Sequence, residues 1–175
     1  DDNENIIARP FRKFFNLGEH EGSLPAGDFK IFEKMDGSLG ILYFGTDGVP
    51  YIATRGSFES EQAIHANEIL KEKYASIPFN REWTYLFEII YPENRIVVDY
   101  KGQDDLIFLG CVNNQSGVDD FAEQSFIGIG KHMPFVYQYG GGSIAAGMFK
   151  DVTYELMSID KDNFEGYVVR WPNGF

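Results

Sequence analysis

Phe32-Glu33-Lys34-Met35-Asp36-Gly37-Ser38-Leu39-Gly40 places a lysine two residues before an Asp-Gly pair, between two apolar runs. The first run covers residues 29–32 and the second covers residues 39–44. Apolar runs on either side of Asp-Gly predict two β-strands joined by a tight turn. The flanking backbone would then hold Lys34 in place instead of leaving it to move in solvent.

The motif alone fits two interpretations of Lys34. Asp-Gly is the most common hairpin dipeptide, so Lys-x-Asp-Gly can be an ordinary β-turn with a solvated lysine beside it. An ordinary lysine has a pKa of about 10.4 and is protonated at neutral pH. A nucleophilic lysine needs burial or neighbouring cations that release its lone pair. The rest of the chain decides between the two.

The composition predicts a folded chain without a membrane segment. The 175 residues suffice for one well-cored domain, and 16 Phe, 10 Tyr and 2 Trp argue against disorder. No apolar run approaches the roughly 18 residues of a membrane-spanning helix. The single cysteine, Cys111, cannot form an internal disulfide, so we expect a buried strand thiol and a reducing, intracellular setting.

The formal net charge of −12 argues against a general nucleic-acid coat, because phosphate binding needs clustered lysine and arginine side chains. A polyanionic substrate would need a local basic pocket or a more basic segment elsewhere. Net charge alone therefore disfavours a nucleic-acid enzyme.

Hydrophobic periodicity and turn residues predict more strands than helices. We expect strands at residues 29–34, 39–45, 50–54, 83–91, 95–100, 106–113, 134–138 and 164–171. We expect helices at residues 59–76, 119–131 and 152–159. Residues 12–19 fit a short helix or an irregular loop, and Gly140-Gly141-Gly142 indicates a flexible turn. Short turns between strands favour an α+β fold of mostly antiparallel sheets with flanking helices.

Residues 59–76 give the clearest helical pattern in the chain. Ser57 or Ser60 can cap the start of this helix. Its inward face is expected to consist of Ala63, Ile64, Asn67, Leu70 and Tyr74.

Two strand ends carry a charged residue next to glycine. Arg55-Gly56 follows the predicted strand 50–54, and an arginine there suits an anionic phosphate. Glu165-Gly166 opens the last predicted strand, where glycine lets a ligand or metal approach the carboxylate closely. A surface arginine and an edge-strand glutamate are the ordinary alternatives.

Glu88 is the one carboxylate in the apolar run of residues 84–90. A buried charge needs a cation or a hydroxyl group as partner. Alternation places Glu88 on the face opposite Phe87 and Ile89, where it either faces solvent or binds a partner. Arg95, close by in the sequence, is one candidate partner.

Two other kinds of site are not supported. His20, His65 and His132 are scattered without ligand spacing, so we discard a zinc site and a histidine-based triad. Gly140-Gly141-Gly142 lacks the Lys-Ser/Thr of a phosphate loop.

The order Lys34-x-Asp36-Gly37, Arg55-Gly56, Glu88 and Glu165-Gly166 resembles the motif series of the covalent nucleotidyltransferases, the superfamily of ATP-dependent ligases and capping enzymes. Five elements in the right order, counting the one described next, are far more specific than any one of them. The resemblance runs from about residue 6 to the end of the chain.

Two further stretches narrow the resemblance to one family. Lys13-Phe14-Phe15-Asn16 is similar to the Lys-Phe-Phe-Asn element of the phage RNA ligase 1 family. Residues 92–97 are similar to the Pro-x-Asn-Arg-Ile-Val stretch of the same ligases. The resemblance implies an adenylyltransferase domain with the nucleotidyltransferase (ATP-grasp-like) fold, belonging to an ATP-dependent RNA ligase.

The family implies a reaction and its cofactors. Lys34 would attack the α-phosphorus of ATP, expel pyrophosphate and hold AMP as a phosphoramidate. AMP would pass to an RNA 5′-phosphate, and an RNA 3′-hydroxyl would displace it to seal the strand. Glu165 would help to organise Mg²⁺, or Mn²⁺, directly or through water.

The family also implies nucleotide-binding residues. Lys13 and Phe15 would help to position the triphosphate and the nucleotide. Arg55 would contact the ribose or the α-phosphate region, and Glu88 would bind the ribose hydroxyls. Gly37 belongs to the same set.

Two more residues would contact the adenine. The backbone at Glu33 would meet its edge, and Val168 would lie against its face. Strict strand alternation puts Glu165 and Val168 on opposite faces. Either the strand is irregular there, or one of these two assignments is wrong.

The chain departs from the family pattern at both ends. A Lys-x-Lys element is expected soon after the Glu-Gly strand, and an Arg-Gly strand is expected before Lys-Phe-Phe-Asn. We therefore expect residues 1–175 to form a single adenylyltransferase domain that is trimmed at both ends, with a possible C-terminal domain missing.

Three alternatives stay open for the function. A DNA ligase or an mRNA-capping guanylyltransferase would share the scaffold, and a catalytically silent nucleotide- or RNA-binding domain would share the motifs. We expect a monomer that acts on RNA ends in the cytoplasm, or in the host cytoplasm if a phage encodes it.

Overall fold

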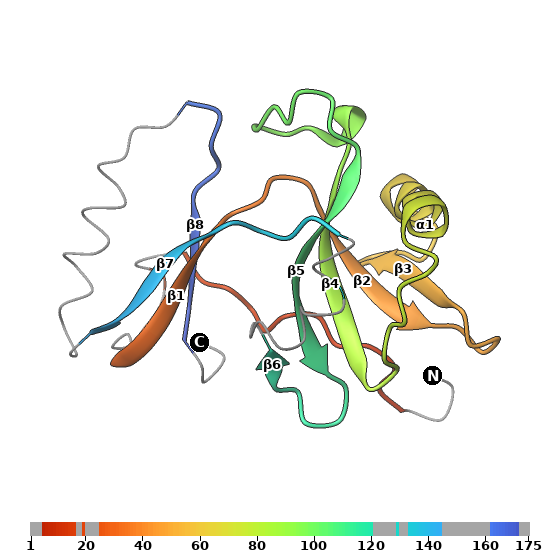
Figure 1. Ribbon diagram of the computed structural model, residues 1–175, viewed down its shortest axis with the longest axis horizontal. Helices are drawn as coiled ribbons and strands as arrows, with labels where there is room; N and C mark the ends of the chain where they lie inside the picture. The colour runs from red at the N-terminus through yellow and green to blue at the C-terminus, as the bar shows by residue number, and fades with distance from the viewer. Residues whose placement is uncertain are drawn as a thin grey trace. The chain divides into compact units, whose positions relative to one another are not determined.

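The computed structural model describes residues 5–16, 19, 25–120, 129, 133–144 and 162–171. The chain divides into two compact units (Figure 1). Unit 1 consists of Asp1–Phe11 and Asp36–Val136, and unit 2 consists of Arg12–Met35 and Tyr137–Phe175. The boundary passes between Met35 and Asp36, inside the lysine motif. That residues 1–175 form one adenylyltransferase domain stays a prediction.

Unit 1 is built on a five-stranded antiparallel sheet in the order β3-β2-β4-β5-β6. Its strands are β2 (Ser38–Phe44), β3 (Pro50–Thr54), β4 (Trp83–Ile90), β5 (Asp105–Asn113) and β6 (Asp119–Asp120). Helix α1 (Glu61–Lys73) and the short 3-10 helix η1 (Pro92–Asn94) also belong to this unit. Strands β2 to β5 match the predicted ones to within a few residues, whereas β6 was not predicted.

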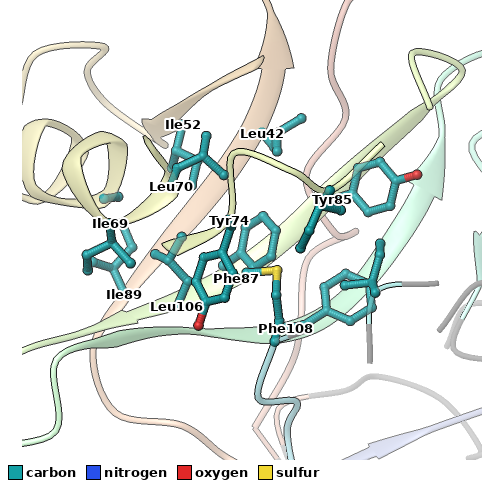
Figure 2. Packing of buried hydrophobic residues seen from close by; sticks show 14 of the residues in the cluster. Leu42, Ile52, Ile69, Leu70, Tyr74, Tyr85, Phe87, Ile89, Leu106 and Phe108 are labelled. Carbon is teal, nitrogen blue, oxygen red and sulfur yellow. The ribbon is translucent and has the colours of Figure 1, made fainter. Parts of the chain in front are cut away.

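The core of unit 1 lies between the sheet and α1 (Figure 2). Alternate strand residues such as Leu42, Phe87 and Phe108 are fully buried, as period-2 patterning requires. The Phe87 and Phe108 rings lie 5.7 Å apart. Burying each such side chain stabilises the unit by roughly 1.5–3 kcal/mol. The Cys111 thiol is buried here, as predicted.

Helix α1 begins where the sequence placed one of its two candidate caps. The Ser60 hydroxyl accepts a hydrogen bond from the Ala63 N–H, at 3.2 Å. Asn67 bonds to both the N–H and the C=O of Ile52, each at 2.8 Å, and so covers backbone groups of edge strand β3. The expectation for Ile64 was wrong: it is 53% exposed, and Ile69 is buried instead.

Unit 2 contains a three-stranded antiparallel sheet in the order β7-β1-β8. Its strands are β1 (Gly27–Glu33), β7 (Gln138–Ile144) and β8 (Tyr167–Arg170). Figure 1 shows β1 between the other two. Phe29, Ile31 and Trp171 form a small buried cluster in this unit. The two sheets confirm the α+β class with mostly antiparallel pairing.

The strands on either side of the lysine motif do not pair with each other. β1 pairs with β7 and β8, whereas β2 pairs with β3 and β4. The expected tight turn between paired strands is therefore wrong, and residues 34–37 instead connect two sheets. β1 finds its partners β7 and β8 far along the chain, which a local turn signal does not encode.

The strand expected at residues 95–100 is absent, because a side chain takes the donors that a strand partner would need. The Asp36 carboxylate accepts the N–H groups of Val97 and Val98. Ile96, in the same segment, is 71% exposed. The segment is an irregular loop tied to the lysine motif.

Three more predictions differ from the structure. Gly140-Gly141-Gly142 is not a turn but part of β7, because backbone pairing with β1 needs no side chains. Asp119 pairs with Val112 at the edge of β5 instead of starting a helix. Phe135 makes an isolated bridge to Phe108, and of the expected strand 134–138 only Gln138 is in a strand, at the start of β7.

The structure describes one further predicted segment only in part and another not at all. Residues 12–16 are irregular, which agrees with the loop alternative for 12–19. The predicted helix at 152–159 lies outside the described residues. Among the residues that are described, no helix is long and apolar enough to cross a membrane.

Candidate active site

Lys34 is fixed at the end of β1 by two contacts within unit 2. Its backbone N–H donates to the Gly166 carbonyl at 2.9 Å, and its Nζ donates to Oε1 of Glu165. The Lys34 side chain is 47% exposed and that of Glu165 is 24% exposed. The amine is therefore held in one place while part of it stays open to a ligand.

Gly166 accounts for the irregularity expected between Glu165 and Val168. Its φ of +143° is a conformation that side-chain-bearing residues rarely adopt, and it precedes the start of β8. Glu165 is thus outside the strand, so strict alternation does not relate it to Val168. Val168 pairs with Phe32 of β1, beside the motif.

Glu33 uses its amide within the protein. The Glu33 N–H donates to the Tyr137 carbonyl at 2.9 Å. A backbone contact from Glu33 to an adenine would therefore have to use its carbonyl oxygen, which accepts.

The Lys-Phe-Phe-Asn element makes two cation–π contacts in unit 2. The Nζ of Lys13 lies 5.0 Å from the centroid of the Phe15 ring, and the Arg170 guanidinium lies 5.2 Å from that of Phe14. The structure thus brings Lys13 and Phe15 together and connects their element to β8.

Gly37 and Glu88 lie side by side in unit 1. A Cβ added to Gly37 would come within 2.5 Å of the Ile89 carbonyl oxygen and 3.2 Å of the Glu88 Cγ. Only glycine fits this close approach of the motif to β4. Glu88 is half-buried and paired in register with Leu39 of β2.

The pairing of strands in unit 1 also brings Arg55 close to the part of the sheet where Glu88 lies. Thr54 pairs with Gly40, which pairs on its other side with Phe87, the neighbour of Glu88. Arg55 directly follows Thr54 and is exposed. Arg95 pairs with Asp99 at 3.4 Å, and its suggested pairing with Glu88 stays a prediction.

Asp36 has a structural role that the sequence interpretation missed. Its side chain is buried, and its Oδ2 accepts the N–H groups of Val97 and Val98, both at 2.6 Å. Its own N–H donates to the Tyr100 hydroxyl at 2.8 Å. An aspartate that becomes buried needs such donors, but their position in the sequence is not encoded locally.

Glu165 fits a divalent cation by its chemistry, because carboxylate oxygens are the ligands that Mg²⁺ and Mn²⁺ prefer. No group of three His, Cys, Asp or Glu side chains suited to a metal occurs among the described residues. A metal at Glu165 would therefore need further ligands, which a bound triphosphate can supply.

The candidate residues fall into two groups. Lys34 and Glu165 belong to unit 2, and Gly37, Arg55 and Glu88 belong to unit 1. The motif from Lys34 to Gly37 runs directly from one unit to the other.

Comparison with known proteins identifies the family that this motif order resembles. The profile of the RNA ligase family matches residues 1–174. The chain belongs to the RNA ligase family. This membership confirms the resemblance to the phage-type RNA ligases.

Two relatives show how much of an RNA ligase the chain represents. A protein of Thermovibrio ammonificans that carries the name RNA ligase is 29% identical over 140 residues, which are 74% of this chain and 36% of the relative. An RNA ligase of Rhodothermus phage RM378 is 25% identical over 147 residues, which are 60% of this chain and 33% of the relative. The chain therefore spans about a third of the length of these relatives.

A solved structure shares the fold. The RNA ligase of Naegleria gruberi, solved as a lysine-to-alanine mutant with ATP and Mn, is 16% identical and has a TM-score of 0.59. The match covers 85% of this chain and 47% of that one.

Proposed function

We propose that this member of the RNA ligase family is the nucleotidyltransferase part of an ATP-dependent RNA ligase, with Lys34 as its nucleophile. One observation carries the proposal. The motif lysine is held by the Gly166 carbonyl and the Glu165 carboxylate, the two residues of the last family motif. The ATP and Mn in the Naegleria gruberi ligase support ATP and a divalent metal here.

In the first step, the Lys34 Nζ loses a proton and its lone pair forms a bond to the α-phosphorus of ATP. The bond from that phosphorus to the bridging oxygen breaks, and pyrophosphate leaves with the electron pair. An oxygen of the RNA 5′-phosphate then attacks the AMP phosphorus and releases Lys34. Finally the RNA 3′-hydroxyl attacks the activated 5′-phosphate and expels AMP.

The described side chains fit these steps in unit 2. Glu165 orients the Lys34 amine through their hydrogen bond. Lys13 supplies positive charge for the triphosphate, Phe15 helps to position the nucleotide, and Val168 packs against the adenine face. When bound, Mg²⁺ or Mn²⁺ would neutralise phosphate charge and polarise the leaving group.

Residues of unit 1 complete the proposed set. Glu88 accepts hydrogen bonds from the ribose hydroxyls, and Arg55 binds the ribose or the α-phosphate region. Gly37 lets the motif approach Glu88 closely.

The wider assignments are also part of the proposal. The partners are RNA 5′-phosphate and 3′-hydroxyl ends, and a further domain accompanies the chain. We propose a monomer that acts in the cytoplasm, or in the host cytoplasm if a phage encodes it.

Nucleotide and polymer selectivity test the proposal. The protein is incubated with Mg²⁺ and either ATP or GTP, and its intact mass is measured. Sealing is then measured on single-stranded RNA and on nicked DNA. We expect an adduct with ATP only and sealing of RNA only.

Other results would point to the alternatives. A GTP adduct would indicate a capping guanylyltransferase, and sealing of nicked DNA would indicate a DNA ligase. ATP binding without any adduct would indicate a silent nucleotide-binding domain.

A further inference from the structure

Tyr43, Tyr51 and Phe58 form an aromatic strip on unit 1. The rings of Tyr43 and Tyr51, paired across β2 and β3, have centroids 5.9 Å apart. Phe58 packs edge-on against Tyr43, with centroids 5.2 Å apart, and is 64% exposed. The neighbouring Leu42 and Ile52 are buried in the core with α1, so alternation puts both tyrosines on the opposite sheet face.

The loop that carries Phe58 is tied down by hydrogen bonds. The Thr54 N–H donates to the Ser57 carbonyl at 2.9 Å, and the Glu59 N–H donates to the Ser57 hydroxyl at 2.9 Å. The hydroxyls of Thr54 and Ser60 lie 3.0 Å apart and share a further bond. The exposed ring is therefore held against Tyr43 and presented to solvent by an ordered loop.

The strip shares a sheet face with a proposed nucleotide-binding residue. Leu39 and Tyr43 are four residues apart on β2 and so point to the same face, about 13 Å apart along the strand. Leu39 is paired with Glu88 of β4. The aromatic strip thus continues the face on which Glu88 lies.

The strip is uncharged at neutral pH. The Tyr51 hydroxyl donates to Oδ2 of Asp47 at 2.8 Å, which raises the pKa of Tyr51, and burial raises the pKa of Tyr43. The carboxylate of Asp47 and the chain's net charge of −12 disfavour phosphate binding at this place. Stacking of bases on aromatic rings does not depend on positive charge.

We infer that the aromatic strip is a stacking surface for bases of single-stranded RNA. The inference rests on the proposed RNA ligase function, which supplies the RNA. An acidic chain gains little RNA affinity from counterion release. Base stacking adds affinity that does not need positive charge. Binding at the strip therefore depends only weakly on salt concentration.

The test measures binding of a fluorescent single-stranded RNA with a 5′-phosphate to the full chain, without ATP. Phe58→Ala should weaken binding about tenfold. Phe58→Leu keeps an apolar side chain without a ring and should weaken binding similarly, whereas Phe58→Trp should bind like the parent. Phe135→Ala removes a 57% exposed phenylalanine beside β5 and should leave binding unchanged.

The same proteins are assayed for the ATP adduct by intact mass and for self-association by sedimentation. All variants should form the adduct normally, since AMP transfer to lysine needs no RNA. Parental RNA affinity in Phe58→Ala or Phe58→Leu would overturn the inference, and so would an adduct defect in Phe58→Ala. A dimer that Phe58→Ala dissociates without loss of RNA affinity would show a protein interface instead.

Different results would contradict the proposed function and the inference about the aromatic strip. If the parent forms the adduct but binds RNA independently of Phe58, only the strip is wrong. If no adduct forms while RNA binding still depends on Phe58, the ligase proposal fails and the strip stands.

Discussion

The Nζ of Lys34 donates a hydrogen bond to Oε1 of Glu165, which lies 131 residues further along the chain. This ion pair lies next to a backbone hydrogen bond, in which the Lys34 N–H donates to the Gly166 carbonyl. An ammonium group held by a carboxylate is oriented but not yet nucleophilic. Attack on a phosphorus requires that the amine lose a proton and leave this partner.

Glu165→Gln should reduce adduct formation far more than stability. The side chains are partly exposed, so loss of the ion pair should change the free energy of unfolding by at most about 1 kcal/mol. Loss of the charged group should slow formation of the ATP adduct about a hundredfold or more. Urea denaturation and timed intact-mass measurements give the two quantities. Asp28→Asn, an exposed change in β1, is the control that should affect neither.

Gly166→Ala should destabilise the chain because of its backbone conformation. At a φ of +143°, a Cβ is strained, which costs about 1–3 kcal/mol. Gly56→Ala is the matched control, since a Cβ there meets nothing within 4 Å and the φ is not in the strained range. Urea denaturation should separate the two variants. Equal stabilities would contradict the role assigned to Gly166.

Asp36→Ala should destabilise unit 1 by about 2–3 kcal/mol, because two N–H groups lose a charged acceptor. Hydrogen exchange of the Val97 and Val98 amides should become faster in the variant. Glu93→Ala removes an exposed carboxylate from η1, just before this loop, and should change stability by less than about 0.5 kcal/mol. If the two variants were equally stable, Asp36 would not hold the loop.

Tyr74→Phe should flatten the alkaline decline of stability. The Tyr74 hydroxyl is buried and donates to Asp105, which raises its pKa above the ordinary 10.0. The stability that this group contributes is complete below pH 10 and is lost as pH rises toward the higher folded value. Urea denaturation between about pH 9 and about pH 11, roughly one unit either side of the ordinary tyrosine pKa, measures the slope.

Alternation in the sequence predicts the strands of unit 1 well, because residues such as Phe87 and Ile89 must turn inward together. It does not predict which strands pair. β1 and β2 are neighbours in sequence but belong to different sheets, since β1 finds its partners near the end of the described chain. Long-range pairing of this kind leaves no local signal.

The candidate site, like the fold, could be predicted from the sequence only in part. The order of motifs led to the RNA ligase family and marked Lys34 and Glu165 separately. The sequence pointed to cations around Lys34, whereas its contact in the structure is a carboxylate. The sequence also did not predict that the Asp36 side chain is buried and holds a loop. Asp-Gly is so common in turns that the pair was interpreted as a turn signal alone.

The central claim is that Lys34 carries AMP. After incubation with ATP and Mg²⁺, intact-mass analysis and peptide mapping should find one AMP per chain, attached at Lys34. Lys34→Arg keeps a positive charge opposite Glu165 but lacks the amine, so it should form no adduct while its unfolding is unchanged. Lys30→Arg, in β1 just before Lys34, should form the adduct normally. An adduct in Lys34→Arg, or one mapped to another lysine, would contradict the account.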